Sequence, residues 1–418
     1  MAIGYACITI GVQDAKQARC TIGNATEDNL RRLIKDNLNA LDAAIDYNIA
    51  MGISLFRISS DIVPFGSHPV NKLLWWEEFG EKLAQIGKKV IDSGMRATMH
   101  PGQYTVLNSK NSEVVDNALL DLKYHCKFMD VLGLDEKNKM ILHVGGVYGD
   151  KKNSAEVFKS NYLRLPDNIK GRLIIENDDK NYTVEDVLGI SRALEVPVVF
   201  DNLHNKLNPS LETIPEQGWV DICRSTWKQK DGVQKIHYSQ QKAGGTAGSH
   251  SDTIYIEEFI KFYNNIRDKN IDIMLEVKDK NISCIKCINS SSSKTSAKDL
   301  EEEWARYKYF VLSRSASIYS EIREQLKDKE NIDAVRFYKK IEQAIDKAED
   351  KGAEVNAAQH VWGYINKNCK EAEKRRFNKL LASYIDKGDG LKSIKNHLLK
   401  CAIEQDISYL INSYYFYI

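Results

Sequence analysis

The sequence has no uninterrupted apolar run of about 18 residues, the length that a helix needs to cross a membrane. Its first residues, MAIGYACITIGVQDAKQ, contain no basic leader followed by a long apolar stretch. We therefore expect no membrane partner and no signal peptide, and we expect the protein to be cytoplasmic.

The chain also has no excess of charge of one sign. It carries 59 Lys and Arg against 58 Asp and Glu, a formal net charge of +1 at pH 7. This balance excludes a uniformly basic protein, although a nucleic-acid binder can be neutral overall if its basic residues share one face. With 418 residues, 43% of them hydrophobic, the chain is long enough for a large core and more than one domain.

Two common motifs are missing as well. No GxGxxG follows the first apolar run, which argues against a dinucleotide-binding fold and a nucleotide cofactor. The eight cysteines include one CxxC pair, Cys284 and Cys287, but no second pair at zinc-ribbon spacing. We interpret this pair as structural and the cysteines as reduced thiols, because disulfides are rare in cytosolic proteins.

Eight short apolar runs are present. Between them lie segments with apolar residues every three or four positions, for example 29–51 and 184–194, as in amphipathic helices. Thr26 and Thr183 precede two of these segments as N-caps. Strand and helix alternating eight times imply parallel strands with right-handed crossovers, so we predict an α/β fold, a (β/α)8 TIM-type barrel. The runs span 4–10, 55–61, 96–101, 139–145, 172–178, 196–204, 235–240 and 272–280.

The pattern changes after Glu276. A Ser-rich stretch, INSSSSKTSAK, is typical of a loop or linker, and only helical patterns follow from Leu300. We predict a barrel domain over 1–299 and an all-α domain over 300–418, although segment 301–312 could instead be the closing helix of the barrel. The aromatic tail, SYLINSYYFYI, is expected to pack on these helices. The later helices are predicted near 329–350, 354–369, 371–387 and 391–403.

The later apolar runs are followed by side chains that bind metals. A parallel barrel gathers its strand ends on one rim, so these side chains can meet there. A single site needs three or four protein ligands, so we expect more than one ion, with Glu176 as a bridge. Imidazole together with carboxylate suits Zn, Mn, Fe or Co. The predicted ligands are His100, His143, Glu176, Asp201, His204, His237, His250 and Glu276.

Clustered cations lower the pKa of a bound water towards about 7 and neutralise phosphate charge, as cleavage of a phosphodiester requires. Sugar isomerases and epimerases also use paired metals on barrels, so the metals alone leave the reaction open. A third, non-enzymatic interpretation is a recognition or scaffold protein with a degenerate site, against which the complete set of ligands argues.

The motifs around these ligands resemble those of the ultraviolet damage endonucleases, in the same order over about residues 4–290. The resemblance implies an endonuclease IV-like TIM barrel with a metal cluster at its C-terminal rim. It implies a monomeric DNA repair enzyme that nicks damaged double-stranded DNA on the 5′ side of cyclobutane dimers, 6-4 photoproducts and abasic sites. Metal-bound hydroxide would attack the phosphodiester and leave a 3′-hydroxyl and a 5′-phosphate. The motifs are GYACITI, RISSDIVPFGSH, HPGQY, ILHVGG, IEND, DNLHN, KIHYS, GSHSD and LEVKDK.

The resemblance also implies roles for the ligands. Three divalent ions are expected, with Mn as the first choice and Zn, Co or Mg as alternatives. Lys235 lies two residues before His237, on the same face of its strand, and is expected to act with Glu176 and His237 in catalysis. Either it is carboxylated and supplies oxygen donors, or it is a free lysine that contacts phosphate. The three sets are Glu176, Asp201, His237 and Glu276; His100, His143 and Glu176; and His204 with His250.

DNA contacts are expected beside the first ligand. Gln103 and Tyr104 follow His100 directly, and the resemblance implies that they fill the gap left by extruded bases. Tyr5 is a further expected lesion contact, although Thr9 stands where family members often have Asn.

Other expected contacts are weaker. Arg57 is expected to meet DNA phosphates, and His68 to support the ligands, to contact phosphate or to be structural. NAAQHVWGYINK, KRRFNK and LKSIKNHLL resemble a small helical domain of unknown function found in bacterial repair-associated proteins.

Overall fold

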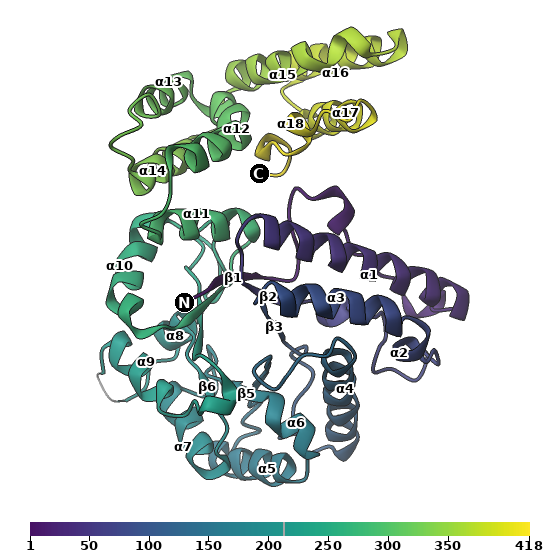
Figure 1. Cartoon of the computed structure of the whole chain (residues 1–418), viewed down its shortest axis with the longest axis vertical. Helices are drawn as coiled ribbons and strands as arrows, with labels where there is room; N and C mark the ends of the chain where they lie inside the picture. Colours follow the sequence, from purple (N-terminus) through teal and green to yellow (C-terminus); the bar gives the residue numbers. More distant parts are fainter. Residues whose placement is uncertain (212–213) are drawn as a thin grey trace. The chain divides into compact units, whose positions relative to one another are not determined.

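The protein, described by a computed structural model over residues 1–211 and 214–418, contains one eight-stranded parallel sheet (Figure 1). Its strand order is β6-β5-β4-β3-β2-β1-β8-β7. The predicted barrel is confirmed. The strands are β1 (Ile3–Ala6), β2 (Leu55–Ile58), β3 (Arg96–Met99), β4 (Met140–His143), β5 (Leu173–Glu176), β6 (Val198–Val199), β7 (Lys235–Tyr238) and β8 (Asp272–Leu275).

The barrel closes between β6 and β7 through a short seam. The backbone N–H of His237 donates to the carbonyl oxygen of Phe200 at 2.9 Å. Asp201, just beyond β6, pairs with His237 as an isolated parallel bridge. Two predicted metal ligands therefore form the backbone contact that joins the two ends of the sheet.

Helices alternate with the strands along the chain and surround them in Figure 1. Both predicted N-caps are confirmed: Thr26 accepts from the N–H of Asn29, and Thr183 forms a capping box with Asp186. These helices are α1 (Glu27–Ala50), α2 (Trp75–Glu78), α3 (Gly80–Asp92), α4 (Ser112–Val131), α5 (Lys151–Leu163), α6 (Asp167–Arg172), α7 (Val184–Leu194), α8 (Asn202–Leu207), α9 (Glu216–Arg224), α10 (Ile256–Ile266) and α11 (Asn281–Ser291).

The chain divides into two compact units. The first comprises Met1–Ile254 with Phe262–Ile285, and the second Tyr255–Lys261 with Lys286–Ile418. All regular structure described after α11 is helical, as predicted, whereas the domain boundary after residue 299 stays a prediction. The helices are α12 (Ala297–Arg314), α13 (Ala316–Gln325), α14 (Ala334–Ile345), α15 (Lys351–Ile365), α16 (Glu371–Lys387), α17 (Leu391–Glu404) and α18 (Ser408–Ile411).

The strands are buried along nearly their whole length, as is usual for a parallel barrel covered by helices. Ile141, Ile174 and Val199, from three neighbouring strands, form one fully buried apolar cluster. This packing leaves only the strand ends and the loops after them for chemistry.

Some local predictions need correction. The Ser-rich stretch is a loop only in part, because Ser290 and Ser291 still belong to α11, where the Ser291 hydroxyl donates to the Cys287 carbonyl at 2.7 Å. The helix predicted at 329–350 is shorter, since α14 runs from Ala334 to Ile345.

Cys284 and Cys287 are buried in α11, in agreement with a structural role, and the eight cysteines, all within the described residues, form no disulfide. The aromatic tail packs as predicted: Tyr414 and Tyr415 are buried, and the rings of Tyr414 and Tyr307 lie 4.7 Å apart.

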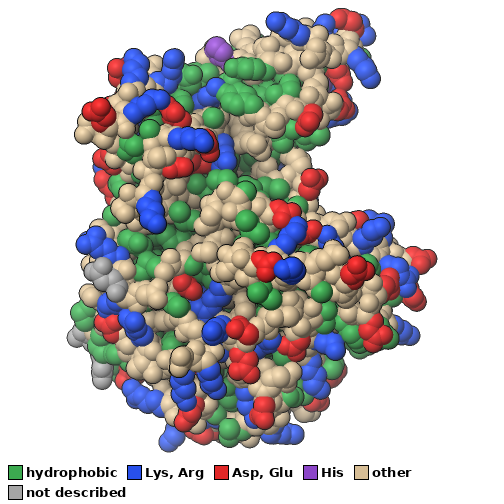
Figure 2. Space-filling model, viewed as in Figure 1, with side chains coloured by type: hydrophobic (Ala, Val, Ile, Leu, Met, Phe, Trp, Pro, Cys, Tyr) green, Lys and Arg blue, Asp and Glu red, His purple; other side chains and the backbone are tan. Residues whose placement is uncertain are grey.

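The surface carries both signs of charge. Figure 2 shows Lys and Arg side chains intermixed with Asp and Glu over the face in view. Among residues 1–211 and 214–418, every helix is too short or too polar to cross a bilayer.

Candidate metal centre

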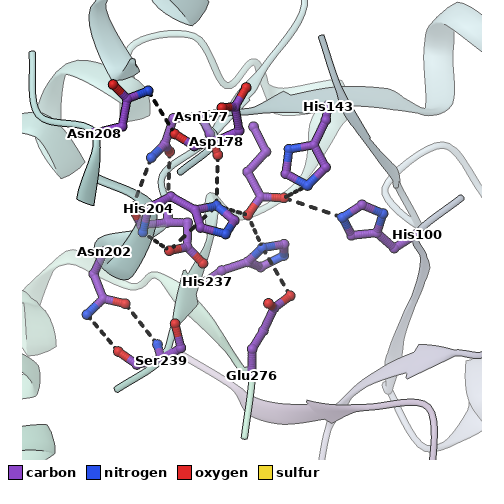
Figure 3. Close-up of polar contacts among 12 residues, drawn as sticks. His100, His143, Asn177, Asp178, Asn202, His204, Asn208, His237, Ser239 and Glu276 are labelled. Carbon is purple, nitrogen blue, oxygen red and sulfur yellow. Dashed lines mark hydrogen bonds and ion pairs between the residues drawn. The ribbon is translucent and has the colours of Figure 1, made fainter. Parts of the chain in front are cut away.

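Figure 3 shows the imidazoles of His100, His143, His204 and His237 gathered in one place. The carboxylate of Glu176, at the end of β5, lies among them. Its Oε2 is 3.5 Å from Nε2 of His100 and 3.7 Å from Nε2 of His143. Its Oε1 accepts from Nδ1–H of His237 at 2.7 Å and lies 3.6 Å from Nδ1 of His204. Four imidazoles from different strand ends therefore converge on one carboxylate.

The side chains in this region form three sets. Within each set, the ligand atoms all lie within 4.8 Å of one another. The set of His100, His143 and Glu176 matches a predicted set. The set of Asp201, His237 and Glu276 matches another predicted set, except that Glu176 is missing from it. His204 belongs to the set with Glu176 and Asp201, and Nε2 of His250 lies 3.6 Å from Oε2 of Glu276. The predicted pairing of His204 with His250 stays a prediction. The sets are His100, His143 and Glu176; Glu176, Asp201 and His204; and Asp201, His237 and Glu276.

The site is rich in buried negative charge. Burial raises the pKa of Asp201 to about 7, and the neighbouring carboxylates add to this shift against the effect of His204. Burial alone would raise the pKa of Glu176 too, but His237 and His143 hold it well below its usual range. Burial opposes the charged form of His204, yet Asp201 and Glu176 raise the pKa of His204 to about 9. The carboxylates thus favour positive charge at this place, which a divalent cation could supply on binding a deprotonated His204.

Several buried polar atoms of the predicted ligands lack a hydrogen-bond partner within the described residues. They are Oε2 of Glu176, Oδ2 of Asp201 and Nδ1 of His143. Buried polar atoms in folded proteins are nearly always paired, so unpaired ones need an explanation. A nitrogen and two carboxylate oxygens are suitable donors for a divalent metal, so the residues fit such a group.

Asn177, which the sequence analysis missed, positions two predicted ligands. Its side chain donates to the Asp201 carbonyl at 3.1 Å and accepts from the Asp201 N–H at 2.9 Å. Its own carbonyl accepts from Nδ1–H of His204 at 2.9 Å, which leaves Nε2 of that ring for an ion. Such hydrogen bonds fix the tautomer and direction of ligating histidines. The only signal in the sequence is the position of Asn177 directly after Glu176.

The backbone directs two other histidines. Nδ1–H of His100 donates to the carbonyl of Pro101 at 2.9 Å, so Nε2 faces the site. After His143 the chain turns at Gly145, where φ is 109° and a Cβ would lie 2.4 Å from Oδ1 of Asn108. Only glycine fits that turn.

Arg57 belongs to the interior of the site. Its Nη1 lies 2.7 Å from Oε1 of Glu276, and its Nη2 donates to Nε2 of His237 at 2.8 Å. The side chain is almost completely buried. The expected contact of Arg57 with DNA phosphate stays a prediction.

Lys235 is fully buried in β7, and Nζ has no hydrogen-bond partner among the residues that the structure describes. Burial, together with Arg57 and Arg96, lowers the pKa of Lys235 well below its usual range and so favours the neutral amine. An amine with no exposed surface does not reach a phosphate on the surface in this conformation, whereas carboxylation would give it polar oxygen atoms.

The predicted DNA-inserting residues lie at an exposed turn. Gln103 is exposed, and Tyr104 keeps 66% of its surface accessible. The next residue, Thr105, is buried and donates through Oγ1 to Asp121 at 2.7 Å. Asp121 also accepts from the Ser67 hydroxyl at 2.9 Å. Asp121, which the sequence analysis missed, therefore anchors the buried end of the turn.

Two further predicted residues lie apart from the ligand sets. Tyr5 is fully buried, shares a hydrogen bond of 2.7 Å with the Thr9 hydroxyl and donates to Asn48 at 2.8 Å. Its placement does not support a contact with DNA, because the side chain is buried between β1 and α1. His68 is exposed, and its Nδ1 accepts from the Val70 N–H at 3.1 Å, outside the three sets.

Fold and site together define a TIM-barrel protein with clustered candidate metal ligands at the carboxyl ends of its strands. Residues 1–307 match the family described as UV-endonuclease UvdE, and the chain belongs to this family. Residues 308–418 match a second family, described as a protein of unknown function (DUF1722). The predicted resemblance is confirmed for both parts of the chain.

Similar proteins support this membership. A UV DNA damage endonuclease of Clostridium perfringens (strain 13 / Type A) is 43% identical over 336 residues, which cover 78% of this chain and 80% of the relative. One of Bacillus cereus (strain 03BB102) is 34% identical over 64% of this chain and 84% of the relative. The crystal structure of SacUVDE matches with a TM-score of 0.65 and 36% identity, over 69% of this chain and 96% of that one. The chain is therefore an endonuclease that acts on UV-damaged DNA.

Proposed function

We propose that this endonuclease nicks the damaged strand immediately 5′ to cyclobutane dimers, 6-4 photoproducts and abasic sites, leaving a 3′-hydroxyl and a 5′-phosphate. It would act as a monomer in the cytoplasm. One observation above all supports the proposal: the imidazoles of His100, His143, His204 and His237 surround the single carboxylate of Glu176. Such a donor set suits hydrolysis assisted by divalent metals.

The three sets of ligands suggest three divalent ions. We assign Mn²⁺, since the carboxylates of Glu176, Asp201 and Glu276 favour a hard ion and the imidazoles tolerate it. When bound, the ions would lower the pKa of a coordinated water towards about 7, so that hydroxide attacks the phosphodiester, and would neutralise charge on the phosphate oxygens.

The residues of the chain prepare this reaction. Glu176 belongs to two of the sets, so its carboxylate would keep the ions of both sets at a constant separation. Asn177 fixes the direction of His204 and Asp201. Lys235, which we propose to be carboxylated, would add oxygen donors next to His237 on β7.

Lesion recognition is assigned to the exposed turn after His100. Gln103 and Tyr104 are accessible, and the Thr105 hydroxyl donates to Asp121. The two exposed side chains can therefore enter a duplex while the end of the turn at Thr105 stays anchored. Extruding a base from a duplex costs a few kcal/mol, and least where pairing is already poor. Damaged pairs would therefore be selected.

One assay tests the proposal. The protein is incubated with Mn²⁺ and a labelled duplex that contains a single thymine dimer. We expect one nick directly 5′ to the dimer, with a 3′-hydroxyl that a polymerase extends. A folded protein that leaves the duplex intact with Mn²⁺, Zn²⁺, Co²⁺ and Mg²⁺ would defeat it, and turnover of an aldose instead would favour a barrel isomerase or epimerase.

A further inference from the structure

A second cluster of metal-binding side chains lies in the helical unit and shares no residue with the barrel site. It contains Cys369, Glu373 and Cys401, whose ligand atoms all lie within 4.8 Å of one another. Cys369 is two residues before α16, Glu373 is in its first turn, and Cys401 is in α17. Both cysteines are buried, with 7% and 1% of their surface exposed.

A histidine completes the cluster. His397 precedes Cys401 by one turn of α17, so the two side chains share a face of the helix. Nε2 of His397 lies 3.8 Å from Sγ of Cys401 and donates to the backbone carbonyl of Glu373 at 3.1 Å. The ring is buried, with 5% of its surface exposed. Two thiols, a carboxylate and an imidazole therefore meet where α16 begins.

These four residues are of three types, Cys, His and Glu, that bind zinc in proteins, and structural zinc is tetrahedral. With Zn–S bonds of about 2.3 Å, two sulfurs in such a site lie about 3.8 Å apart, and a sulfur and a nitrogen slightly closer. The spacing within the cluster is thus already close to that of a metal site. We propose that the helical unit binds one Zn²⁺ through Cys369, Glu373 and Cys401, with His397 as the fourth ligand once its ring exchanges the Glu373 carbonyl for the ion.

Two neighbouring hydrogen bonds leave the cluster able to hold an ion. Nε2 of Gln405 donates to Sγ of Cys369 at 3.4 Å, a contact of the kind that orients and stabilises metal-bound sulfur. One oxygen of Glu373 accepts from the Lys370 N–H at 2.8 Å, and a carboxylate can bind an ion through its second oxygen at the same time. No large rearrangement of the backbone is required.

The proposed site differs in chemistry from the barrel site. None of the eight ligands predicted in the barrel is a cysteine, whereas two sulfurs dominate this cluster and select softer ions. Zn²⁺ here would connect the start of α16 to the second half of α17 and so stabilise the helical unit, while the ions of the barrel serve the reaction.

Thiolate absorption distinguishes the two sites in the intact chain. The full-length protein is stripped of metal, titrated with Co²⁺ and followed by the intense near-ultraviolet absorption of thiolate-to-cobalt charge transfer. At saturation we expect the intensity of one thiolate-bound Co²⁺ per chain, whatever Co²⁺ the barrel ligands also take up, and we expect Zn²⁺ to abolish the absorption by displacement. The variant Cys369→Ser/Cys401→Ser should lose it. The control Cys7→Ser should keep the absorption. Cys7 is the matched control because it is the cysteine whose pKa is affected by the charges of Arg57 and Glu276, two residues of the barrel site.

Two further measurements cover failure of the double variant to fold. Glu373→Gln keeps both sulfurs and should retain the absorption while weakening Zn²⁺ binding about 10- to 100-fold. Mass spectrometry of protein purified without air should find both thiols reduced. The proposal is overturned by wild-type protein that shows no thiolate absorption with Co²⁺, by absorption that survives loss of both cysteines, or by a Cys369–Cys401 disulfide in the anaerobic protein.

Discussion

Arg57 donates through Nη2 to Nε2 of His237 at 2.8 Å, while Nη1 of the same guanidinium lies 2.7 Å from Oε1 of Glu276. His237 in turn donates through Nδ1–H to Glu176 at 2.7 Å. Burial, assisted by Arg57, lowers the pKa of His237 to about 4, so the ring is neutral. A guanidinium thus holds two residues that a divalent cation would also bind.

The first prediction follows from this competition. Arg57→Met should destabilise the metal-free protein by about 3–5 kcal/mol, because it leaves Glu276 as a buried charge without its partner. Added Mn²⁺ should replace the lost positive charge, so the rise in melting temperature on metal addition should be larger in the variant than in the wild type. Differential scanning calorimetry with and without Mn²⁺ measures both quantities.

Arg96→Met is the matched control. Arg96 forms a comparably buried pair with Asp272 at 3.1 Å, but Asp272 is at the start of β8, far along the strand from Glu276. The control should lose stability and keep the metal-dependent rise of the wild type. Equal rises in the Arg57 and Arg96 variants would show that Arg57 and the metal do not share ligands.

The second prediction concerns the bridge. Glu176→Gln should reduce incision more than about 100-fold, because Glu176 belongs to two sets of ligands. The amide of Gln has one oxygen, a weaker metal ligand than a carboxylate, so both sets would lose affinity for their ions. The assay is nicking of the dimer-containing duplex under saturating Mn²⁺. Glu303→Gln, which also changes a buried carboxylate but lies in α12 of the helical unit, should incise normally. Full activity of the Glu176 variant would refute the bridge.

The third prediction concerns the exposed turn. Gln103→Ala/Tyr104→Ala should lower incision at a dimer about 5- to 150-fold, which corresponds to the roughly 1–3 kcal/mol of one base stacked on an aromatic ring. Melting temperature and Mn²⁺ affinity should not change, because both side chains are exposed. Tyr364→Ala removes another exposed tyrosine, in the helical unit, and should have no effect. A double variant as active as the wild type would exclude insertion by this turn.

The fourth prediction concerns Lys235. Its buried, unpaired amine should react with carbon dioxide to form an N–C bond and lose one proton, giving a carbamate. After acid treatment, refolded protein should regain activity faster with added bicarbonate, and carbon-13 bicarbonate should give a carbamate NMR signal that Lys235→Met lacks. Unmodified Lys235 in fully active enzyme, detected by mass spectrometry under mild conditions, would rule out carboxylation.

The fifth prediction concerns pH. Burial raises the pKa of Glu354 in α15, with partial compensation by Lys395 and Arg314. The protonated form is therefore favoured in the folded state; its contribution to stability is complete below the unfolded pKa of about 4.3 and is lost as pH rises through the folded pKa. Glu354→Gln, which mimics the protonated form, should gain stability over the wild type as pH increases from about 5 to about 8.

The control for this prediction has the opposite sign. The hydrogen bond from Lys374 lowers the pKa of the exposed Glu371, so its contribution is present above the unfolded pKa and lost as pH falls. Glu371→Gln should therefore lose stability relative to the wild type as pH rises. Urea unfolding followed by circular dichroism at several pH values compares both variants, and parallel curves for Glu354→Gln and the wild type would contradict the assignment.

The sequence was most informative where one rule of geometry links sequence to space. Parallel strands present their carboxyl ends on one side, so residues at run ends, such as His100, His143 and Glu176, could be predicted to meet. Their convergence is observed. The resemblance of the surrounding motifs then distinguished a DNA endonuclease from a sugar isomerase, which the ligands alone could not do.

Other parts of the site depend on contacts that no local pattern shows. Arg57 and Tyr5 lie on strands buried along their whole length, and the sequence alone does not tell that both side chains are enclosed. The partners of Asn177 and Asp121 come from distant segments, so two ordinary polar residues could not be recognised as anchors. The contact of His250 with Glu276 was not predicted either, while the pairing of His204 with His250 stays a prediction.

The seam of the barrel gives the metal centre a second significance. β6 has two residues, and the bridge between Asp201 and His237 joins the ends of the sheet. Both residues belong to one set of candidate ligands. An ion bound there would therefore link β6 and β7, the two end strands of the sheet, where their backbone pairing is weakest. Loading with metal would then be a late folding step as well as activation, and a chain that has lost its ions would be a barrel that can open along one side.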